Sequence, residues 1–511
     1  MASGVESRAW SELDLRMREI CDLDHVGRLL SWDQETYMPA GGVEHRGRQL
    51  ALLLGLLHER AGDPRVGELL AAVEGAPSLA DGDCPDGDCA AAANVRELRR
   101  EYDRATRVPR ELVEELARTT AAAHEAWVAA RKHARFATFR PWLEKIVALK
   151  RSEAEALGYA ATPYDALLDT YEPGAEAASV ARLFDALRRE LIPLVAAILD
   201  SPRRPRTAVL HRDYPVERQR VFGEAVAAAV GFDFERGRVD TSVHPFCVGV
   251  GPGDCRLTAR WSANDFAEGV LGVLHEVGHA LYEQGLDPAH AGTPMGEAVS
   301  LGVHESQSRL WENRVGRSRD FWAYFLPRAR ELFHDALRDV ALDEFVFAIN
   351  DVRPSAIRVR ADEVTYNLHT LIRFELERAL IAGDLAAADV PDAWNALYRE
   401  HLGVTPADDA EGCLQDSHWS AGLIGYFPTY TIGDICAAQL FARATADLGD
   451  LPAAFREGHF EPLREWLRER VHRHGHRWRT AALVERVTGA PPDPRALVDA
   501  LRQKYGELYG L

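Results

Sequence analysis

The strongest constraint on this chain is a pair of histidines within an apolar helical segment. His275 and His279 lie four residues apart in the segment 266–284 (FAEGVLGVLHEVGHALYEQ), and Glu276 lies between them. Residues four apart share one face of a helix, so both imidazoles are expected to point the same way. A buried helix tolerates such polar side chains only when they have partners. The segment therefore predicts a helix whose two histidines bind a common partner, and a metal ion suits this spacing.

The residue between the histidines indicates the chemistry. An H-E-x-x-H helix is typical of zinc hydrolases, in which the histidines bind the ion and the glutamate is the general base. The sequence thus predicts His275 and His279 as metal ligands and Glu276 as the catalytic carboxylate. One open position is expected, where zinc would lower the pKa of a bound water to about 7. One Zn²⁺ per chain is expected, and Co²⁺ is the alternative, because N/O sites accept several divalent metals.

A third protein ligand is needed, and spacing alone leaves its identity open. Glu305 is the first candidate; it lies in the segment 296–313, which predicts a second helix after a break that contains Gly and Pro. Its rivals are Glu283, Glu297 and His304. The alternative for Glu305 is an exposed helical carboxylate, the usual situation of glutamate.

Further motifs occur in order along the chain. They are His244-Pro245-Phe246, Asp254-Cys255-Arg256-Leu257-Thr258, His304-Glu305-Ser306-Gln307, Ile357-Arg358-Val359-Arg360-Ala361-Asp362 and Gly412-Cys413-Leu414-Gln415-Asp416-Ser417-His418-Trp419. Together with H-E-x-x-H, they resemble the motifs of the carboxypeptidase Taq family of metallocarboxypeptidases, from about residue 30 to the C-terminus. The resemblance implies that His275, His279 and Glu305 are the ligands, that Glu276 is catalytic, and that the protein is a homodimer.

A carboxypeptidase must recognise the free C-terminus of its substrate. Arginine suits a carboxylate because its planar group can donate two parallel hydrogen bonds. Arg358 is the first candidate, mainly on the resemblance of its motif, and Arg256 is the second. The alternative for Arg358 is a helical ion pair with Asp362, four residues further on. His244 is expected either to line the same cleft or only to end a strand.

The reaction also needs hydrogen-bond donors for the negative charge that develops on the scissile carbonyl oxygen. His418, Tyr426 and Tyr430 are the candidates. The alternative for His418 is a core histidine beside Trp419, and the alternative for both tyrosines is simple packing.

Composition restricts the class of protein. The net charge of −19 disfavours nucleic acid or an anionic membrane as a partner, since both need a cationic surface. No apolar stretch approaches the about 18 residues of a membrane span, and no secretory signal is recognisable. The seven cysteines, an odd and low number, favour a reducing, cytoplasmic setting. Cys84 and Cys89 are expected to lie in a solvated loop rather than to form a metal clip.

The predicted fold is mainly α. Apolar residues recur at helical spacing in the segments 10–30, 46–60, 92–104, 110–132, 142–157 and 179–192. The segment 238–261, rich in Val, Thr and Gly, predicts a small β-sheet or hairpin beside the metal-binding helix, with a tight turn at 251–253. We expect a single helical metallopeptidase unit over 1–511 with a deep cleft. Its N-terminal helical part would cover about 1–200 and its zinc-site part about 201–511.

These features predict a metal-dependent carboxypeptidase that hydrolyses the C-terminal peptide bond of peptides through a metal-bound water, with Glu276 as general base. A zinc endopeptidase or oligopeptidase with the same metal site is the alternative. A helical scaffold with a structural metal is a third hypothesis. It is disfavoured because structural zinc usually has four protein ligands, often Cys, and the nearest cysteine in sequence is Cys255.

Overall fold

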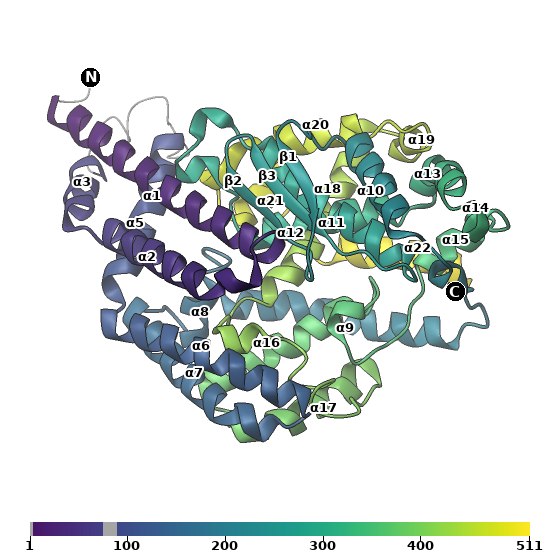
Figure 1. Cartoon of the computed structure of the whole chain (residues 1–511), viewed down its shortest axis with the longest axis horizontal. Helices are drawn as coiled ribbons and strands as arrows, with labels where there is room; N and C mark the ends of the chain where they lie inside the picture. Colours follow the sequence, from purple (N-terminus) through teal and green to yellow (C-terminus); the bar gives the residue numbers. More distant parts are fainter. Residues whose placement is uncertain (1–3, 75–88) are drawn as a thin grey trace. The chain divides into compact units, whose positions relative to one another are not determined.

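A computed structural model of the chain describes residues 4–74 and 89–511. Within these residues the protein is mainly helical and contains one three-stranded sheet (Figure 1). The predicted fold class is therefore confirmed. No helix in the described ranges is long and apolar enough to cross a membrane. The loop predicted around Cys84 lies outside the described residues.

The chain forms two compact units, each assembled from three segments. Unit 1 comprises residues 1–106, 206–349 and 440–491, and unit 2 comprises residues 107–205, 350–439 and 492–511. The organisation as a single unit with a deep cleft stays a prediction.

Unit 1 contains the sheet and the helices that carry the predicted metal ligands. Its helices are α1 (Gly4–Thr36), α2 (Val43–Ala61), α3 (Pro64–Glu74), α5 (Ala90–Arg107), α10 (Val216–Val230), α11 (Phe266–Gly285), α12 (Leu301–Arg309), α13 (Arg319–Leu332), α14 (His334–Leu337), α15 (Leu342–Ile349), α19 (Leu451–Arg456), α20 (Glu461–Arg470) and α21 (Thr480–Thr488). Its short 3₁₀ helices are η1 (Ala40–Gly42), η2 (Thr207–His211), η3 (Pro288–His290), η4 (Pro294–Gly296) and η9 (His472–Arg477), and η5 (Leu310–Gly316) is a π-helix. The predicted helices at 10–30, 46–60 and 92–104 correspond to α1, α2 and α5.

The described residues of unit 2 form helices, turns and loops and contain no strand. Its helices are α6 (Arg110–Lys132), α7 (Phe136–Leu157), α8 (Pro163–Leu168), α9 (Ala177–Asp200), α16 (Tyr366–Ala382), α17 (Val390–Leu402) and α22 (Arg495–Tyr509), with the 3₁₀ helices η6 (Arg358–Arg360), η7 (Ala387–Asp389) and η8 (His418–Ala421). Helix α18 (Pro428–Leu448) begins in unit 2 and ends in unit 1. The predicted helices at 110–132, 142–157 and 179–192 correspond to α6, α7 and α9.

The sheet lies directly before α11 in the chain. Strands β1 (Gly237–Thr241), β2 (Cys247–Gly251) and β3 (Asp254–Ala259) lie in the order β1-β3-β2 (Figure 1). Strand β2 pairs antiparallel with β3, and β1 pairs parallel with β3. Gly253, in the turn between β2 and β3, has a φ of +78°, which glycine adopts without strain. The sheet and its predicted turn are confirmed, and the sheet packs against α11.

Helix α11 has a defined start and a buried face. The side chain of Asp265 accepts a hydrogen bond from the backbone nitrogen of Glu268 at 3.0 Å, which caps the helix. Phe266 is fully buried, with ring centroids 4.8 Å from Tyr214 and 5.3 Å from Phe333. Because this apolar packing fixes the rotation of the helix about its axis, it also fixes the direction in which the H-E-x-x-H side chains point.

Helices α11 and α12 are in close backbone contact at Gly278. A Cβ atom at this position would lie 2.5 Å from the carbonyl oxygen of Gln307 and 2.6 Å from Cα of Ser308. Only glycine allows two backbones to come this close. The contact brings Glu305, three residues before Ser308, beside the histidine-bearing face of α11.

We expect Gly278→Ala to lower the free energy of unfolding by about 1–3 kcal/mol, the usual cost of overpacking. It should also weaken metal binding, because α12 must move away and take Glu305 with it. Thermal unfolding and metal titration measure the two effects. Gly272→Ala, on the same helix, is the control, since a Cβ atom there meets nothing within 4 Å. Equal metal affinity in the two variants would contradict the expectation.

Helix α12 is shorter than predicted. The segment 296–313 was expected to form one helix, but Pro294–Gly296 form the separate turn η4 and α12 begins at Leu301. The helix starts there because the side chain of Ser300 accepts a hydrogen bond from the backbone nitrogen of Val303 at 3.0 Å. After Arg309 the chain continues as the π-helix η5, a rare geometry that is frequent at functional sites.

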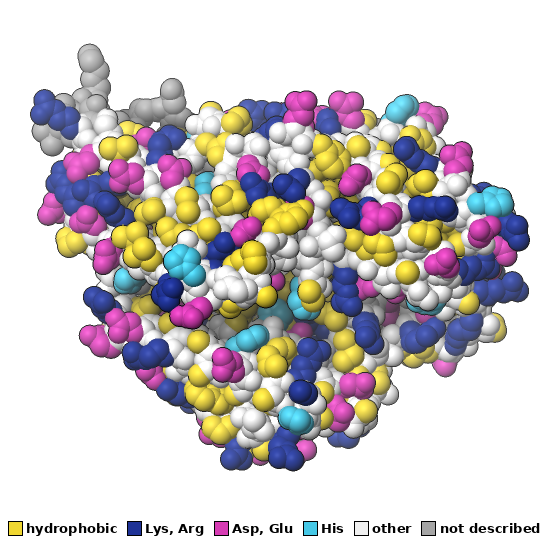
Figure 2. Space-filling view, viewed as in Figure 1, with side chains coloured by type: hydrophobic (Ala, Val, Ile, Leu, Met, Phe, Trp, Pro, Cys, Tyr) yellow, Lys and Arg dark blue, Asp and Glu magenta, His cyan; other side chains and the backbone are white. Residues whose placement is uncertain are grey.

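The surface carries charges of both signs. On the face that Figure 2 shows, Lys and Arg side chains are interspersed with Asp and Glu. A nucleic-acid partner would need a continuous cationic stripe or patch. The absence of a nucleic-acid partner stays a prediction from the net charge.

Candidate metal centre

Three side chains predicted as metal ligands come together in unit 1. His275 and His279 lie on α11 and Glu305 on α12, and their ligand atoms all lie within 4.8 Å of one another. Glu305 Oε2 is 3.7 Å from His275 Nε2 and 3.4 Å from His279 Nε2. Atoms bound to one tetrahedral zinc at about 2.0–2.2 Å lie about 3.4 Å apart. The spacing of the three atoms therefore fits a common ion.

The other nitrogen of His275 is held by a carboxylate. His275 Nδ1 lies 3.0 Å from Glu312 Oε2 and donates to it, so the Nε2 lone pair faces the cluster. Burial alone would lower the pKa of His275, but the Glu305 and Glu312 carboxylates raise it to about 9. A divalent cation can satisfy the same carboxylates in place of that proton. Glu312 was not predicted; its position seven residues after Glu305, two helical turns on the same face, is the signal that could have identified it.

A second relay orients His279. His304 Nδ1 lies 2.6 Å from His279 Nδ1, and His304 Nε2 lies 2.8 Å from Glu283 Oε1. Because Glu283 accepts the proton of His304 Nε2, His304 Nδ1 accepts the proton of His279 Nδ1. The Nε2 lone pair of His279 is thereby left for an ion. Burial lowers the pKa of His279 to about 3, so the ring is neutral, the form that binds metal.

Glu305 is buried and ionised. Arg309 Nε donates to its Oε1 at 2.7 Å, and Ser308 Oγ donates to its Oε2 at 3.1 Å. Burial would raise the pKa of Glu305, but Arg309 and His275 outweigh it and hold the pKa below its ordinary value. The donor set is thus two imidazoles and one carboxylate, with the remaining polar atoms held by neighbours. This set fits a divalent transition-metal ion.

Glu276 lies beside the cluster without being part of it. It follows His275 on α11 and is only 6% exposed. Burial raises the pKa of Glu276 to about 7, against the opposing effect of His275. A carboxyl group with such a pKa can both accept and release a proton near neutral pH.

The rival third ligands lie elsewhere. His304 and Glu283 stand behind His279, on the side away from the ligand atoms. Glu297 accepts a hydrogen bond from Arg28 at 3.2 Å and belongs to a different cluster. The structure therefore separates Glu305 from its rivals, which spacing could not do.

In unit 2 the structure brings four other predicted site residues together, namely Arg358, His418, Tyr426 and Tyr430. The guanidinium carbon of Arg358 lies 5.2 Å from the ring centroid of Tyr430. His418 Nε2 lies 3.3 Å from the Tyr430 hydroxyl, and the Tyr426 and Tyr430 rings are 5.4 Å apart. Burial lowers the pKa of His418 to about 4, so its imidazole is neutral at pH 7.

Arg358 is buried, and its ion-pair partner is Asp416. The alternative prediction, an ion pair with Asp362, is therefore wrong. Arg358 Nε and Nη2 donate to Asp416 Oδ1 at 3.0 and 2.8 Å, and Nη1 donates to the Tyr366 hydroxyl at 3.0 Å. Arg373 Nε donates to the other oxygen of Asp416 at 2.7 Å. Two arginines therefore share one carboxylate, which leaves one net positive charge in this group.

The second-choice arginine is also paired. Arg256 on β3 donates from Nε and Nη2 to Asp254 at 2.8 and 2.7 Å, and its guanidinium lies 4.2 Å from the Trp32 ring centroid. His244 lies between β1 and β2 and is exposed. Substrate roles for Arg256 and His244 stay predictions.

Metal-dependent hydrolases combine a histidine pair with a carboxylate and an adjacent buried glutamate. Unit 1 contains this combination on two neighbouring helices, α11 and α12. The family model for the carboxypeptidase Taq (M32) metallopeptidases matches residues 12–505, so the chain belongs to this family. It is thus a metallocarboxypeptidase, a hydrolase that acts on peptides, and the family implies a divalent metal ion. Family membership confirms the predicted resemblance and favours the carboxypeptidase over the endopeptidase hypothesis.

Individual relatives agree with this assignment. The chain is 51% identical over 503 residues to a thermostable carboxypeptidase 1 of Thermus thermophilus, covering 96% of this chain and 97% of that protein. It is 36% identical over 494 residues to carboxypeptidase 1 of Bacillus subtilis, with 96% and 97% coverage. The crystal structure of the M32 carboxypeptidase from Deinococcus radiodurans R1 matches with a TM-score of 0.94 at 43% identity, covering 99% of this chain and 100% of that chain.

Proposed function

We propose that this metallocarboxypeptidase releases the C-terminal residue of peptides at a metal site formed by His275, His279 and Glu305, with Glu276 as general base. The observation that supports this most is the convergence of two imidazole nitrogens and one carboxylate oxygen at spacings suited to one ion. We propose zinc as the ion, since two nitrogens and one oxygen are a typical catalytic zinc set, with cobalt as the alternative.

The bound ion would supply Lewis-acid chemistry to the scissile carbonyl group. The residues of the chain would transfer the proton and orient the two imidazoles. One carboxylate oxygen of Glu276 accepts the proton of the attacking water and then donates it to the nitrogen of the leaving residue. Glu312 and the Glu283–His304 pair keep the two imidazoles in the tautomer that presents Nε2.

Substrate recognition is a separate part of the proposal. We propose that Arg358 binds the free C-terminal carboxylate, because the Arg358–Arg373–Asp416 group is buried and carries one excess positive charge. Asp416 orients the guanidinium, which is flanked by the aromatic rings of Tyr366 and Tyr430. His418, Tyr426 and Tyr430 are proposed as donors to the oxyanion.

A time course on one peptide tests the reaction type. Stepwise loss of single C-terminal residues, followed by mass spectrometry, is the expected result. Internal fragments as the first products would contradict a carboxypeptidase and indicate an endopeptidase.

We expect Arg358→Ala to lower kcat/KM on peptides with a free C-terminus by about 30-fold or more. Truncating one partner of a buried charge pair typically costs about 2–5 kcal/mol. Metal content should not change, because Arg358 is not a proposed ligand. Arg360→Ala is the matched control, since Arg360 lies in the same turn η6 and is exposed. Comparison of free and C-terminally amidated peptides decides the role: equal wild-type activity on both would exclude it.

Oligomeric state and location are also proposals. Helix α2 buries none of its residues, and Leu52 and Leu54 on it are each 66% exposed. Apolar side chains of this kind often lie in interfaces, and we propose a second copy of the chain as their partner. A reducing, cytoplasmic setting is supported by the free thiols of Cys21, Cys247, Cys255, Cys413 and Cys436. Light scattering on the purified chain measures the oligomeric state.

A further inference from the structure

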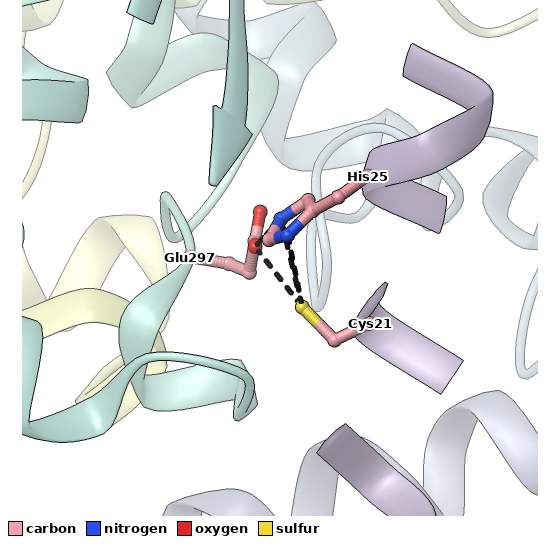
Figure 3. A group of neighbouring side chains, drawn as sticks. All are labelled: Cys21, His25 and Glu297. Atoms are coloured by element: carbon pink, nitrogen blue, oxygen red, sulfur yellow. Dashed lines mark hydrogen bonds and ion pairs between the residues drawn. The ribbon is translucent and has the colours of Figure 1, made fainter. Parts of the chain in front are cut away.

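A second cluster of ligand-type side chains lies outside the proposed peptidase site. Cys21 and His25, one turn apart on α1, meet Glu297, which lies between η4 and α12 (Figure 3). All three belong to unit 1, and none has a role in the proposed reaction.

One atom from each side chain points to a common centre. Cys21 Sγ lies 3.6 Å from His25 Nε2 and 3.9 Å from Glu297 Oε1, and these last two atoms are 3.4 Å apart. A tetrahedral ion bonded to sulfur at about 2.3 Å and to nitrogen or oxygen at about 2.0–2.2 Å separates such atoms by about 3.4–3.6 Å. Two of the three spacings match this range and the third is slightly longer.

The same geometry disfavours a cysteine nucleophile. In a catalytic relay the nucleophile and the carboxylate contact opposite nitrogens of the imidazole. Here the nearest ring nitrogen to both Cys21 Sγ and Glu297 Oε1 is His25 Nε2. Three atoms that face one another across a centre form a ligand set, whereas a relay would be linear.

The neighbours of the cluster support a ligand role. Arg28 Nη2 donates to Glu297 Oε2 at 3.2 Å, which holds the other oxygen, Oε1, toward Cys21 and His25. Asp24 in turn pairs with Arg28 at 2.6 Å. His25 and Glu297 line a pocket, so a water has access as a fourth ligand. Without a cation, hydrogen bonds to Cys21 and Glu297 raise the pKa of His25 to about 10, and a cation would replace that proton.

We propose that Cys21, His25 and Glu297 bind a second divalent transition-metal ion of the zinc type. A thiolate with an imidazole selects such an ion over Mg²⁺ or Ca²⁺, which prefer oxygen ligands only. The ion fastens α1 to the segment that leads into α12, the helix that carries Glu305.

Cobalt provides the test, because a thiolate–Co²⁺ bond gives a charge-transfer absorption in the near ultraviolet and the proposed peptidase site contains no sulfur. The metal-free full chain is loaded with Co²⁺ and examined by absorption spectroscopy and elemental analysis. Wild type should bind two ions per chain and show the band. Cys21→Ser should bind one ion and lose the band. Cys89→Ser, at a described cysteine outside the cluster, should behave as wild type.

A second variant separates this proposal from the proposed peptidase site. His279→Ala should lose the peptidase-site ion and keep the thiolate band. One bound ion without the band in wild type, or a band that persists in Cys21→Ser, would overturn the proposal. If circular dichroism shows that Cys21→Ser does not fold, wild type decides: Zn²⁺ should protect Cys21 from alkylation, measured by mass spectrometry of its peptide. Equal alkylation with and without Zn²⁺ would exclude the site.

Discussion

Replacement of Glu276 by glutamine is expected to lower kcat by about 10²–10⁴-fold, the range that a general base contributes. Glutamine keeps the size of the side chain but cannot accept the proton of the attacking water. The metal content should stay at the wild-type level, because Glu276 lies outside the group of ligand atoms formed by His275, His279 and Glu305. The effect should therefore appear in turnover and not in metal binding.

Steady-state kinetics on one peptide, combined with elemental analysis of the same samples, measures both quantities. Glu268→Gln is the matched control, since Glu268 lies on the same helix and is exposed. Its kcat should equal that of wild type. Loss of the metal together with activity in Glu276→Gln would show that Glu276 supports the structure of the site instead of acting as a base.

Glu305→Ala is expected to remove most metal affinity and with it the peptidase activity. Loss of an outer-sphere partner typically costs about 10–100-fold in affinity, and loss of a ligand should exceed this. The variant should also be less stable, because Arg309, whose side chain is 11% exposed, loses the carboxylate of Glu305 at 2.7 Å and keeps the more distant Glu312 at 3.7 Å. Breaking a buried ion pair from one side typically costs about 3–5 kcal/mol.

Competition with a chelator gives the affinity, and thermal unfolding gives the stability. Glu312→Gln provides an intermediate case, since Glu312 contacts His275 but is not a proposed ligand. Its metal affinity should fall by about 10–100-fold. Glu331→Ala, at an exposed glutamate of α13, should change neither quantity. An unchanged metal affinity in Glu305→Ala would remove Glu305 from the ligand set.

Features that depend on neighbours in the sequence were predictable. The bounds of the predicted helix at 266–284 differ from those of α11 by one residue, because apolar periodicity and the Asp265 cap are local signals. The pairing of His275 with His279 follows from helical geometry alone. The sheet before α11 was predictable for the same reason, from its composition and its glycine turn.

Features that depend on distant segments were not predictable from residue spacing. Spacing could not separate Glu305 from Glu283, Glu297 and His304, although the family motif favoured Glu305. The partner of Arg358 is Asp416, 58 residues away, because the chain folds back over that distance.

The sequence by itself determined the family, the helical class and the helix that carries the H-E-x-x-H motif, because motifs and periodicity express short-range geometry. Only the tertiary structure decided which carboxylate faces the histidines and which groups stand behind them. The backbone contact at Gly278 and the π-helix η5 set those positions. The meeting of Cys21 and His25 with Glu297 likewise joins segments more than 270 residues apart, a proximity that packing creates and local sequence does not encode.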